Sequence, residues 1–403
     1  MNSGLEKLHP YPFERLAQLK QETPVVTDAE HIDLSIGEPK HTTPKLILDG
    51  LQKQLHEAAS YPTTRGIDEL RQVIADWLIK RFQLPDDSIS ADRNILPVNG
   101  TREALFAFAQ CVIDSNSSRS KAPVVILPNP FYQIYEGAAL LAGAEPYYIN
   151  CVEANGFLPD FDAVPENIWQ RCQLIYLCSP GNPTGAVIGQ KSINELLKLA
   201  NKYDFIIAAD ECYSEIYLDE GSPPVGLLQA AANLGRNDYK HCIVFHSLSK
   251  RSNVPGMRSG FVAGDEKLIQ AFLRYRTYHG CTMPIYTQMA SIVAWQDEEH
   301  VRGNRTLYRQ KFDAVLDILK PVMNVTKPDA SFYLWPETPV SDTDFATGLY
   351  SRQNITVLPG SFLSRSIAAG NPGENRIRVA LVAEINQCIE AAERICEYIN
   401  TLG

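Results

Sequence analysis

Four side chains that could do chemistry together stand just after short apolar runs of the sequence. They are an asparagine, an aspartate, a tyrosine and a lysine: Asn182, Asp210, Tyr213 and Lys250. An amide, a carboxylate, a phenol and a primary amine can together pair with charge, move a proton and form a covalent bond. Each alone has a simpler explanation, because an aspartate after a strand often caps a helix and a lysine is usually solvated. Four of them in this order favour one shared site.

The apolar runs themselves predict buried parallel strands. The runs are four or five residues long: Val124–Leu127, Leu174–Cys178, Phe205–Ala209 and Cys242–His246. They are mostly apolar on both faces, which is typical of strands that helices cover on both sides. Helical patterns such as Ser192–Tyr203 lie between them, so the chain predicts an α/β fold with a mostly parallel central sheet flanked by helices. In such sheets the ligand crevice lies at the carboxyl ends of the strands, where the four side chains would converge.

The alternation of strands and helices extends over residues 45–290, which we expect to form a large domain. The remainder reads as a long helix, two short strands and a closing helix: 305–319, 331–335, 377–381 and 384–402. Residues 1–44 carry five prolines and look like an arm and a connection. We expect 1–44 and 291–403 to pack together as a second, smaller α/β domain.

Composition excludes several classes of function. The 403 residues carry a net charge of −10, which argues against a general nucleic-acid or anionic-membrane surface. The nine cysteines lack the close spacing of metal ligands, so we expect free thiols, no metal and a reducing compartment. Residues 1–19 hold no apolar signal segment, and no run approaches the ~18–20 apolar residues of a membrane span. The sequence therefore predicts a cytoplasmic protein that binds neither nucleic acid nor membrane.

Three motifs around the four side chains resemble those of class I and II aminotransferases, which are pyridoxal-phosphate enzymes of fold type I. The motifs are SPGNPTG at 179–185, ADECY at 209–213, and SLSK at 247–250 followed by PGMRSG at 255–260. The resemblance extends from SIGEP at 35–39 to Arg376, and it implies that the large domain binds pyridoxal 5'-phosphate. Within the family, the stretch 247–261 is most similar to succinyldiaminopimelate aminotransferases of lysine biosynthesis.

The resemblance implies a role for each of the four side chains. Lys250 is implied to bond covalently to the cofactor aldehyde and then to move the proton of the substrate Cα. Nearby cations such as Arg258 would help by lowering its pKa. Asp210 is implied to pair with the pyridinium nitrogen of the cofactor. Tyr213 and Asn182 are implied to contact the phenolic oxygen, and Asn182 is also implied to touch the substrate.

Further cofactor residues follow from the same resemblance. Tyr132 matches the aromatic residue that stacks on the ring, although Phe131 next to it could take that place. The phosphate is implied to bind at a helix start and to side chains around it: Gly100, Thr101, Arg102, Ser247 and Arg258. Gly100 could instead be an ordinary turn glycine. Tyr61 resembles the tyrosine that reaches the phosphate from the neighbouring subunit, so we expect a homodimer with shared active sites.

The substrate α-carboxylate is implied to bind an arginine, whose planar fork suits that group. Arg376 matches the arginine of the family, with the backbone of Gly37 near the same carboxylate. Arg378 would share one face of the strand with Arg376 and remains an alternative. Arg65 could read a second substrate carboxylate from across the dimer, or it could lie solvated in its loop.

Together these expectations describe a pyridoxal-phosphate-dependent aminotransferase. We expect a ping-pong transfer between an amino acid and 2-oxoglutarate or glutamate, with N-succinyl-LL-2,6-diaminopimelate as the favoured substrate. Three alternatives stay open: an aspartate, alanine or aromatic aminotransferase, a β-lyase of the same fold type, and a cofactor-binding protein without activity. The last has no chemical reason to retain Lys250, Asp210, Tyr213 and Arg376 together.

Overall fold

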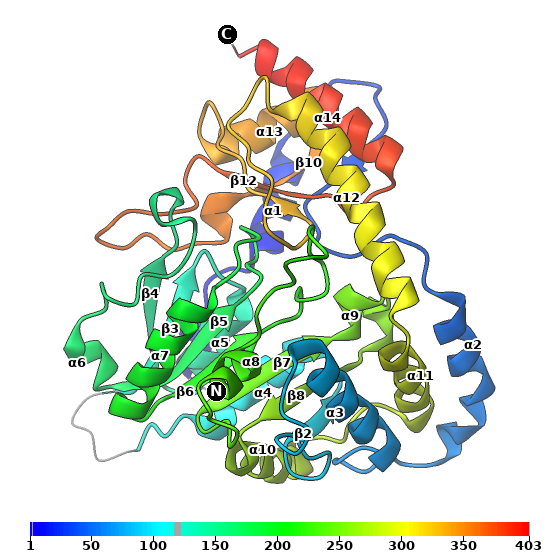
Figure 1. The fold of residues 1–403 in the computed structure, drawn as a ribbon. Helices are drawn as coiled ribbons and strands as arrows, with labels where there is room; N and C mark the ends of the chain where they lie inside the picture. The colour runs from blue at the N-terminus through cyan, green and yellow to red at the C-terminus, as the bar shows by residue number, and fades with distance from the viewer. Residues whose placement is uncertain (2, 117–121, 403) are drawn as a thin grey trace.

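The computed structural model describes residues 1, 3–116 and 122–402, and its largest feature is a seven-stranded sheet (Figure 1). The strands are β2 (Ile95–Val98), β3 (Val124–Asn129), β4 (Glu145–Asn150), β5 (Cys172–Cys178), β6 (Ile206–Asp210), β7 (Cys242–Ser247) and β8 (Gly260–Gly264). Their order is β2-β8-β7-β6-β5-β3-β4, and neighbours are parallel except where β8 runs antiparallel to β7 and β2. The predicted mostly parallel sheet is confirmed, and the four predicted strands are β3, β5, β6 and β7.

Helices cover both faces of this sheet because its strands are apolar on both. On β5, Leu174 and Tyr176 belong to one core and Ile175 and Leu177 to the other, as the two-residue period of a strand requires. One face carries α4 (Thr101–Val112), α5 (Gln133–Leu141) and α10 (Glu266–His279). The other carries α3 (Asp68–Phe82), α7 (Gln190–Tyr203), α8 (Leu227–Asn233) and α11 (Ile285–Gln296), with α2 (Lys45–Lys53) packed on α11 and the short α6 (Glu166–Trp169) before β5.

Apart from the two cores of the large sheet, a further hydrophobic core lies at the far end of α12 (Glu299–Leu319). This long helix runs in Figure 1 from α11 to α14 (Ile385–Asn400). It is accompanied by α13 (Asp342–Gln353) and five short strands: β1 (Ile32–Asp33), β9 (Tyr333–Leu334), β10 (Ile355–Thr356), β11 (Leu358–Pro359) and β12 (Ile377–Ala380). These strands form two small sheets, β1-β10 and β11-β12-β9, so a segment near residue 32 joins the C-terminal core. The predicted domain boundaries themselves stay a prediction.

The N-terminal segment, which the sequence predicts as an arm and a connection, contains a helix that was not predicted, α1 (Pro12–Glu22). Pro12 stands at the first helical position, where its fixed φ favours the helix and its missing N–H is not needed. Leu16 is buried against Phe362 and Leu363 of the C-terminal part. In the described ranges, no helix has the length and apolar character needed to cross a membrane.

Candidate active site

A cavity of about 380 Å³ opens where β5, β6 and β7 end. Ten of the residues predicted from the sequence line it: Gly37, Thr101, Arg102, Tyr132, Asn182, Asp210, Tyr213, Ser247, Lys250 and Arg258. Four further lining residues carry the argument below: Tyr11, Ser249 and Tyr333, which were not predicted, and Arg378, which was the alternative to Arg376. The volume lies within the ~300–1,000 Å³ that small-molecule sites occupy.

Lys250 lies in α9 (Leu248–Arg251), the short helix that follows β7. Its amine donates a hydrogen bond to the carbonyl oxygen of Gly37. Burial lowers the pKa of Lys250 to about 8, and the Arg378 guanidinium is the nearby cation that lowers this pKa further. The sequence assigns that effect to Arg258, whereas burial and Arg378 produce it here. An amine with such a pKa loses its proton near neutral pH, as a base or nucleophile must.

Asp210 ends β6 and is only 5% exposed. The Tyr135 hydroxyl donates to its Oδ2 at 2.6 Å, and the Cys212 N–H donates to its Oδ1 at 3.2 Å. Burial raises the pKa of Asp210, and no basic side chain of the described residues forms an ion pair with it. Tyr135 was not predicted, although its spacing of three residues from Tyr132 is the signal that could have found it. The buried carboxylate suits a cationic group in the cavity.

The start of α4 contributes the features that would bind a phosphate. Gly100 precedes this helix with φ of +87°, and a Cβ there would collide with the Arg258 guanidinium. Only glycine therefore leaves this space open. Hydroxyl groups of Thr101, Ser247 and Ser249 line the same cavity. Oriented N–H groups at a helix start, hydroxyls and a guanidinium together are typical of phosphate sites.

The Arg102 side chain is held by the N-terminal segment. Its Nη2 donates to the Tyr11 hydroxyl at 3.0 Å, and its guanidinium carbon lies 5.5 Å from the centre of the Tyr11 ring. Arg258 pairs with Glu103 at 3.1 Å, whereas Arg102 has no acidic partner among the residues that the structure describes. Arg102 thus brings an uncompensated positive charge to the cavity wall, and only its backbone lies at the helix start as predicted.

The buried arginine of the cavity is Arg378, which lies on β12 and is 4% exposed. Its Nη1 donates to the side-chain oxygen of Asn182 at 2.9 Å, and its Nη2 donates to the carbonyl of Ser35 at 2.7 Å. Its guanidinium carbon lies 4.5 Å from the centre of the Tyr333 ring. A carboxylate entering the cavity would meet a fork that has neutral partners only.

The expectation that Arg376 lies in this cavity is corrected. Arg376 pairs with Glu153 at 2.5 Å and donates to the carbonyl of Trp335 at 3.1 Å, outside the cavity. Two arginines two residues apart share a face only where both belong to a regular strand. β12 begins at Ile377, and although Arg376 bridges Glu337 in line with this strand, its ion pair with Glu153 holds the guanidinium outside the cavity.

Two more predicted residues, Tyr213 and Gly37, meet around Tyr333, which was not predicted. The Tyr213 hydroxyl lies 2.9 Å from that of Tyr333. A Cβ at Gly37 would overlap the same Tyr333 hydroxyl, which explains the need for glycine there. Of the two neighbouring aromatic residues, Tyr132 lines the cavity, whereas Phe131 is buried in the core.

Two predicted residues lie apart from the cavity. Tyr61 is 99% exposed. Arg65 donates to the carbonyl of Asp92 at 2.7 Å and to the side chain of Gln270 at 3.3 Å, so its guanidinium is engaged by its own chain. The expectation that Arg65 binds a substrate carboxylate is therefore not supported, because both terminal nitrogens of its guanidinium already donate within the chain.

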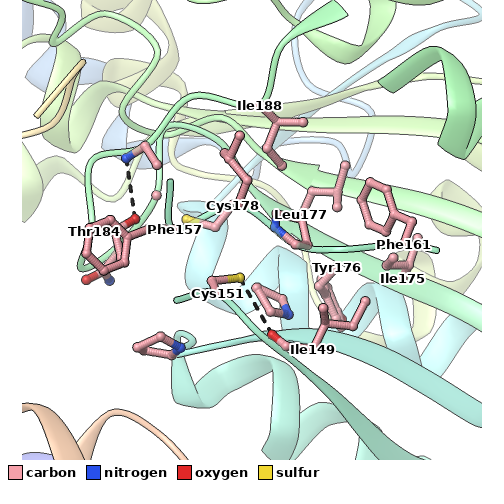
Figure 2. Close-up of a pocket in the computed structure, with 17 residues that line it drawn as sticks. Ile149, Cys151, Phe157, Phe161, Ile175, Tyr176, Leu177, Cys178, Thr184 and Ile188 are labelled. Atoms are coloured by element: carbon pink, nitrogen blue, oxygen red, sulfur yellow. Dashed lines mark hydrogen bonds between the residues drawn. The ribbon is translucent and has the colours of Figure 1, made fainter. Parts of the chain in front are cut away.

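A second, mostly apolar cavity lies beside the first and shares Cys178 and Asn182 with it (Figure 2). Its volume of about 30 Å³ accommodates water but no amino-acid side chain. Burial raises the pKa of Cys178 and of Cys151 on its wall, so both thiols keep their protons. Of these two adjoining cavities, only the one of about 380 Å³ can therefore take a substrate.

The whole chain can be compared with known proteins. The sequence matches the family model of aminotransferases of class I and II over residues 29–395. The chain belongs to this family. An LL-diaminopimelate aminotransferase of Dehalococcoides mccartyi (strain CBDB1) is 32% identical over 406 residues, or 99% of this chain and 98% of that protein.

Two solved aminotransferase structures have the same fold. An aminotransferase from Neisseria meningitidis Z2491 has a TM-score of 0.94 and 50% identity, covering 98% of this chain and 99% of that one. A probable N-succinyldiaminopimelate aminotransferase from Thermus thermophilus has a TM-score of 0.82 and 25% identity, covering 96% and 100%. The fold is thus that of fold-type-I aminotransferases.

Aminotransferases of this family use pyridoxal phosphate, and the cavity residues fit that group. The space beside Gly100, with Arg258 and the start of α4, suits the phosphate. Asp210 is a buried carboxylate that lacks a cation in the described part of the chain, which suits a pyridinium nitrogen. Lys250, an amine with a lowered pKa, suits the aldehyde.

Proposed function

We propose that this aminotransferase transfers amino groups between an amino acid and 2-oxoglutarate or glutamate by a ping-pong mechanism, with pyridoxal phosphate in the cavity that contains Lys250. One observation carries the proposal: the cavity holds a lysine whose pKa is about 8 and a buried arginine that has neutral partners only. The fork of Arg378 would bind the α-carboxylate of either substrate in turn. Lys250 would take the Cα proton as its base.

The other side chains would hold and orient the reactants. When bound, the cofactor supplies an electron-withdrawing ring next to the substrate Cα. Asp210 would hold positive charge at the ring nitrogen, and the 2.6 Å hydrogen bond from Tyr135 aims its carboxylate. Tyr213 and Asn182 would donate to the phenolic oxygen, while Tyr132 would pack against the ring. The phosphate would bind beside Gly100 to the backbone N–H groups of Thr101 and Arg102 and to the side chains of Ser247 and Arg258.

For the second amino acid we propose N-succinyl-LL-2,6-diaminopimelate, whose far end carries two carboxylates. Arg102 supports this proposal, because it is a cation on the cavity wall without an acidic partner in the described ranges. LL-diaminopimelate is a second candidate, since relatives 32% identical carry that name. Its far end carries a carboxylate and an ammonium group, and the ammonium would be repelled by the same arginine.

A substrate comparison tests the proposal. We expect kcat/KM for N-succinyl-LL-2,6-diaminopimelate to exceed that for LL-diaminopimelate, with 2-oxoglutarate consumed in equal amount. Arg102→Gln is expected to lower kcat/KM for the succinylated substrate about tenfold, and to change that for L-alanine little, because L-alanine has no distal acid. Arg65→Gln is the matched control and should behave as wild type. Preference for LL-diaminopimelate would favour the second candidate, and turnover without 2-oxoglutarate would indicate a β-lyase.

We further propose a homodimer in which Tyr61 binds the phosphate in the partner's site. Complete exposure of this aromatic ring supports it, together with Leu48 and Leu55, which are 50% and 52% exposed nearby along the chain. The buried area should exceed roughly 2,000 Å², as in obligate dimers.

Mixing two inactive variants tests the shared site. Tyr61→Ala and Lys250→Ala each spoil every site of their own homodimer, but a mixed dimer keeps one intact site. After dissociation and random reassociation we expect about a quarter of wild-type activity, since half the dimers are mixed and one of their two sites works. Mixed dimers that are isolated and found inactive would contradict the proposal, as would a fully active monomer in sedimentation.

A further inference from the structure

Three buried polar side chains line a separate cavity of about 450 Å³ between α12, residues 41–45 and the start of α14. They are His41, Asn304 and Lys311, which are 8%, 3% and 2% exposed. Nothing in the proposed reaction uses them. Buried polar groups of this kind are costly unless each is hydrogen-bonded, so their partners indicate what they do.

The hydrogen bonds of Lys311 determine the tautomer of His41. An ammonium group only donates, and Lys311 Nζ lies 2.6 Å from His41 Nε2, so Nε2 is the acceptor. The proton of the neutral ring is therefore on Nδ1, which donates to Asn304 Oδ1 at 2.6 Å. Burial lowers the pKa of His41, which agrees with a neutral ring.

The same logic orients the amide of Asn304. Its Oδ1 also accepts from Asn253 Nδ2 at 3.1 Å, so the oxygen already has two donors. The Nδ2 group then faces the main-chain carbonyl of Lys250, at 3.5 Å. That carbonyl belongs to the four-residue helix α9, whose last carbonyls have no partner within the helix. Asn304 thus holds the backbone of Lys250 from α12.

At its other end the network reaches the segment that directly follows β12, the strand that carries Arg378. Lys311 Nζ also donates to the carbonyl of Val382, four residues after Arg378, at 3.4 Å. Among the described residues no acid forms an ion pair with Lys311, although Glu384 and the Cys388 thiol face it and the Tyr308 ring centre lies 5.3 Å away. Hydrogen bonds therefore run from Val382, two residues after β12, through Lys311, His41 and Asn304 to Lys250.

We propose that Lys311, His41 and Asn304 are positioning residues that fix the backbone of Lys250 relative to the strand carrying Arg378. The inference rests on the roles proposed for Lys250 and Arg378. It does not depend on which amino acid is the second substrate. The proton must pass between Lys250 and a substrate held by Arg378. The distance between α9 and β12 therefore decides how close the Lys250 amine comes to the substrate Cα.

Asn304→Asp is the sharpest variant, because it keeps an acceptor for His41 and replaces the donor to the Lys250 carbonyl by an anionic oxygen that this carbonyl repels. Lys311→Met removes the donor at the other end, and Lys311→Arg restores a cation. Gln310→Met is the control, since Gln310 is exposed and lines the same cavity on the same helix. We expect Asn304→Asp and Lys311→Met to lower kcat for the glutamate half-reaction about tenfold with KM within about twofold. Lys311→Arg should recover part of the loss.

Hydrogen exchange in the protein without cofactor gives a readout that does not depend on catalysis. We expect amide exchange at residues 251–254 to become about tenfold faster in Asn304→Asp, with exchange of the central strands unchanged. Wild-type kcat in both Asn304→Asp and Lys311→Met would overturn the inference, as would an equal loss in Gln310→Met. An active Lys250→Ala variant would instead refute the proposed catalytic role and leave the exchange result standing.

Discussion

Lys250→Ala is expected to lose at least about 10³-fold in kcat, because it removes both the covalent nucleophile and the base that moves the Cα proton. The fold should persist, since α9 lies at the edge of a large core and alanine favours a helix. Cofactor should still bind through the phosphate end and Asp210. Single-turnover measurement with glutamate and cofactor retention on gel filtration check the two parts separately.

Lys45→Ala is the matched control, because Lys45 is an exposed lysine that pairs with Asp49 and does not line the cavity that contains Lys250. It should keep wild-type activity. A second check uses the pKa of about 8, which burial and Arg378 produce. In the protein without cofactor, acetylation of Lys250 should accelerate as pH rises through about 8, because only the neutral amine reacts. Activity of Lys250→Ala within tenfold of wild type would contradict the assignment.

Arg378→Ala is expected to lower kcat/KM for both glutamate and the second amino acid. Removing one partner of a buried, hydrogen-bonded charge pair costs about 2–5 kcal/mol, or roughly 30- to several-thousand-fold. Both half-reactions should suffer, since both substrates present an α-carboxylate to the same fork. The variant should also raise the pKa of Lys250, because a cation that lowers this pKa is gone.

Arg376→Ala is the control two residues away, and it should stay near wild type because its partners are Glu153 and Trp335 outside the cavity. Separate single-turnover measurements on each amino acid make the comparison. The assignment of the carboxylate to Arg378 would be wrong if Arg376→Ala lost activity while Arg378→Ala kept it.

The sheet and the convergence of the catalytic side chains could be predicted because a run of four or five residues that is apolar on both faces fits a buried strand and is too short for a helix. The same reasoning located Asn182, Asp210 and Lys250 at neighbouring strand ends, since the carboxyl ends of parallel strands share one edge. These are local features, and each depends on residues that are adjacent in sequence.

What the sequence could not predict depends on contacts between distant segments. Choosing between Arg376 and Arg378 needs their tertiary contacts, because Glu153 holds the first outside the cavity and Asn182 holds the second on its wall. The hydrogen bond from Tyr135 to Asp210 joins residues 75 positions apart. The engagement of Arg65 by Asp92 likewise depends on tertiary packing. α1 was missed because prolines usually indicate an arm or a loop. Proline at the first helical position, where Pro12 lies, is instead compatible with a helix.

The place of Tyr11 and Phe13 on the cavity wall has a practical consequence for producing the protein. Trimming the first helix would remove part of the wall and the hydroxyl that holds Arg102. A bulky affinity tag fused ahead of this segment would be only about ten residues from Tyr11 and Phe13, which line the cavity. α14 ends at Asn400, away from the large sheet, at the top of Figure 1. A tag joined after that helix leaves the cavity clear, and kinetic constants should be measured on protein prepared in that way.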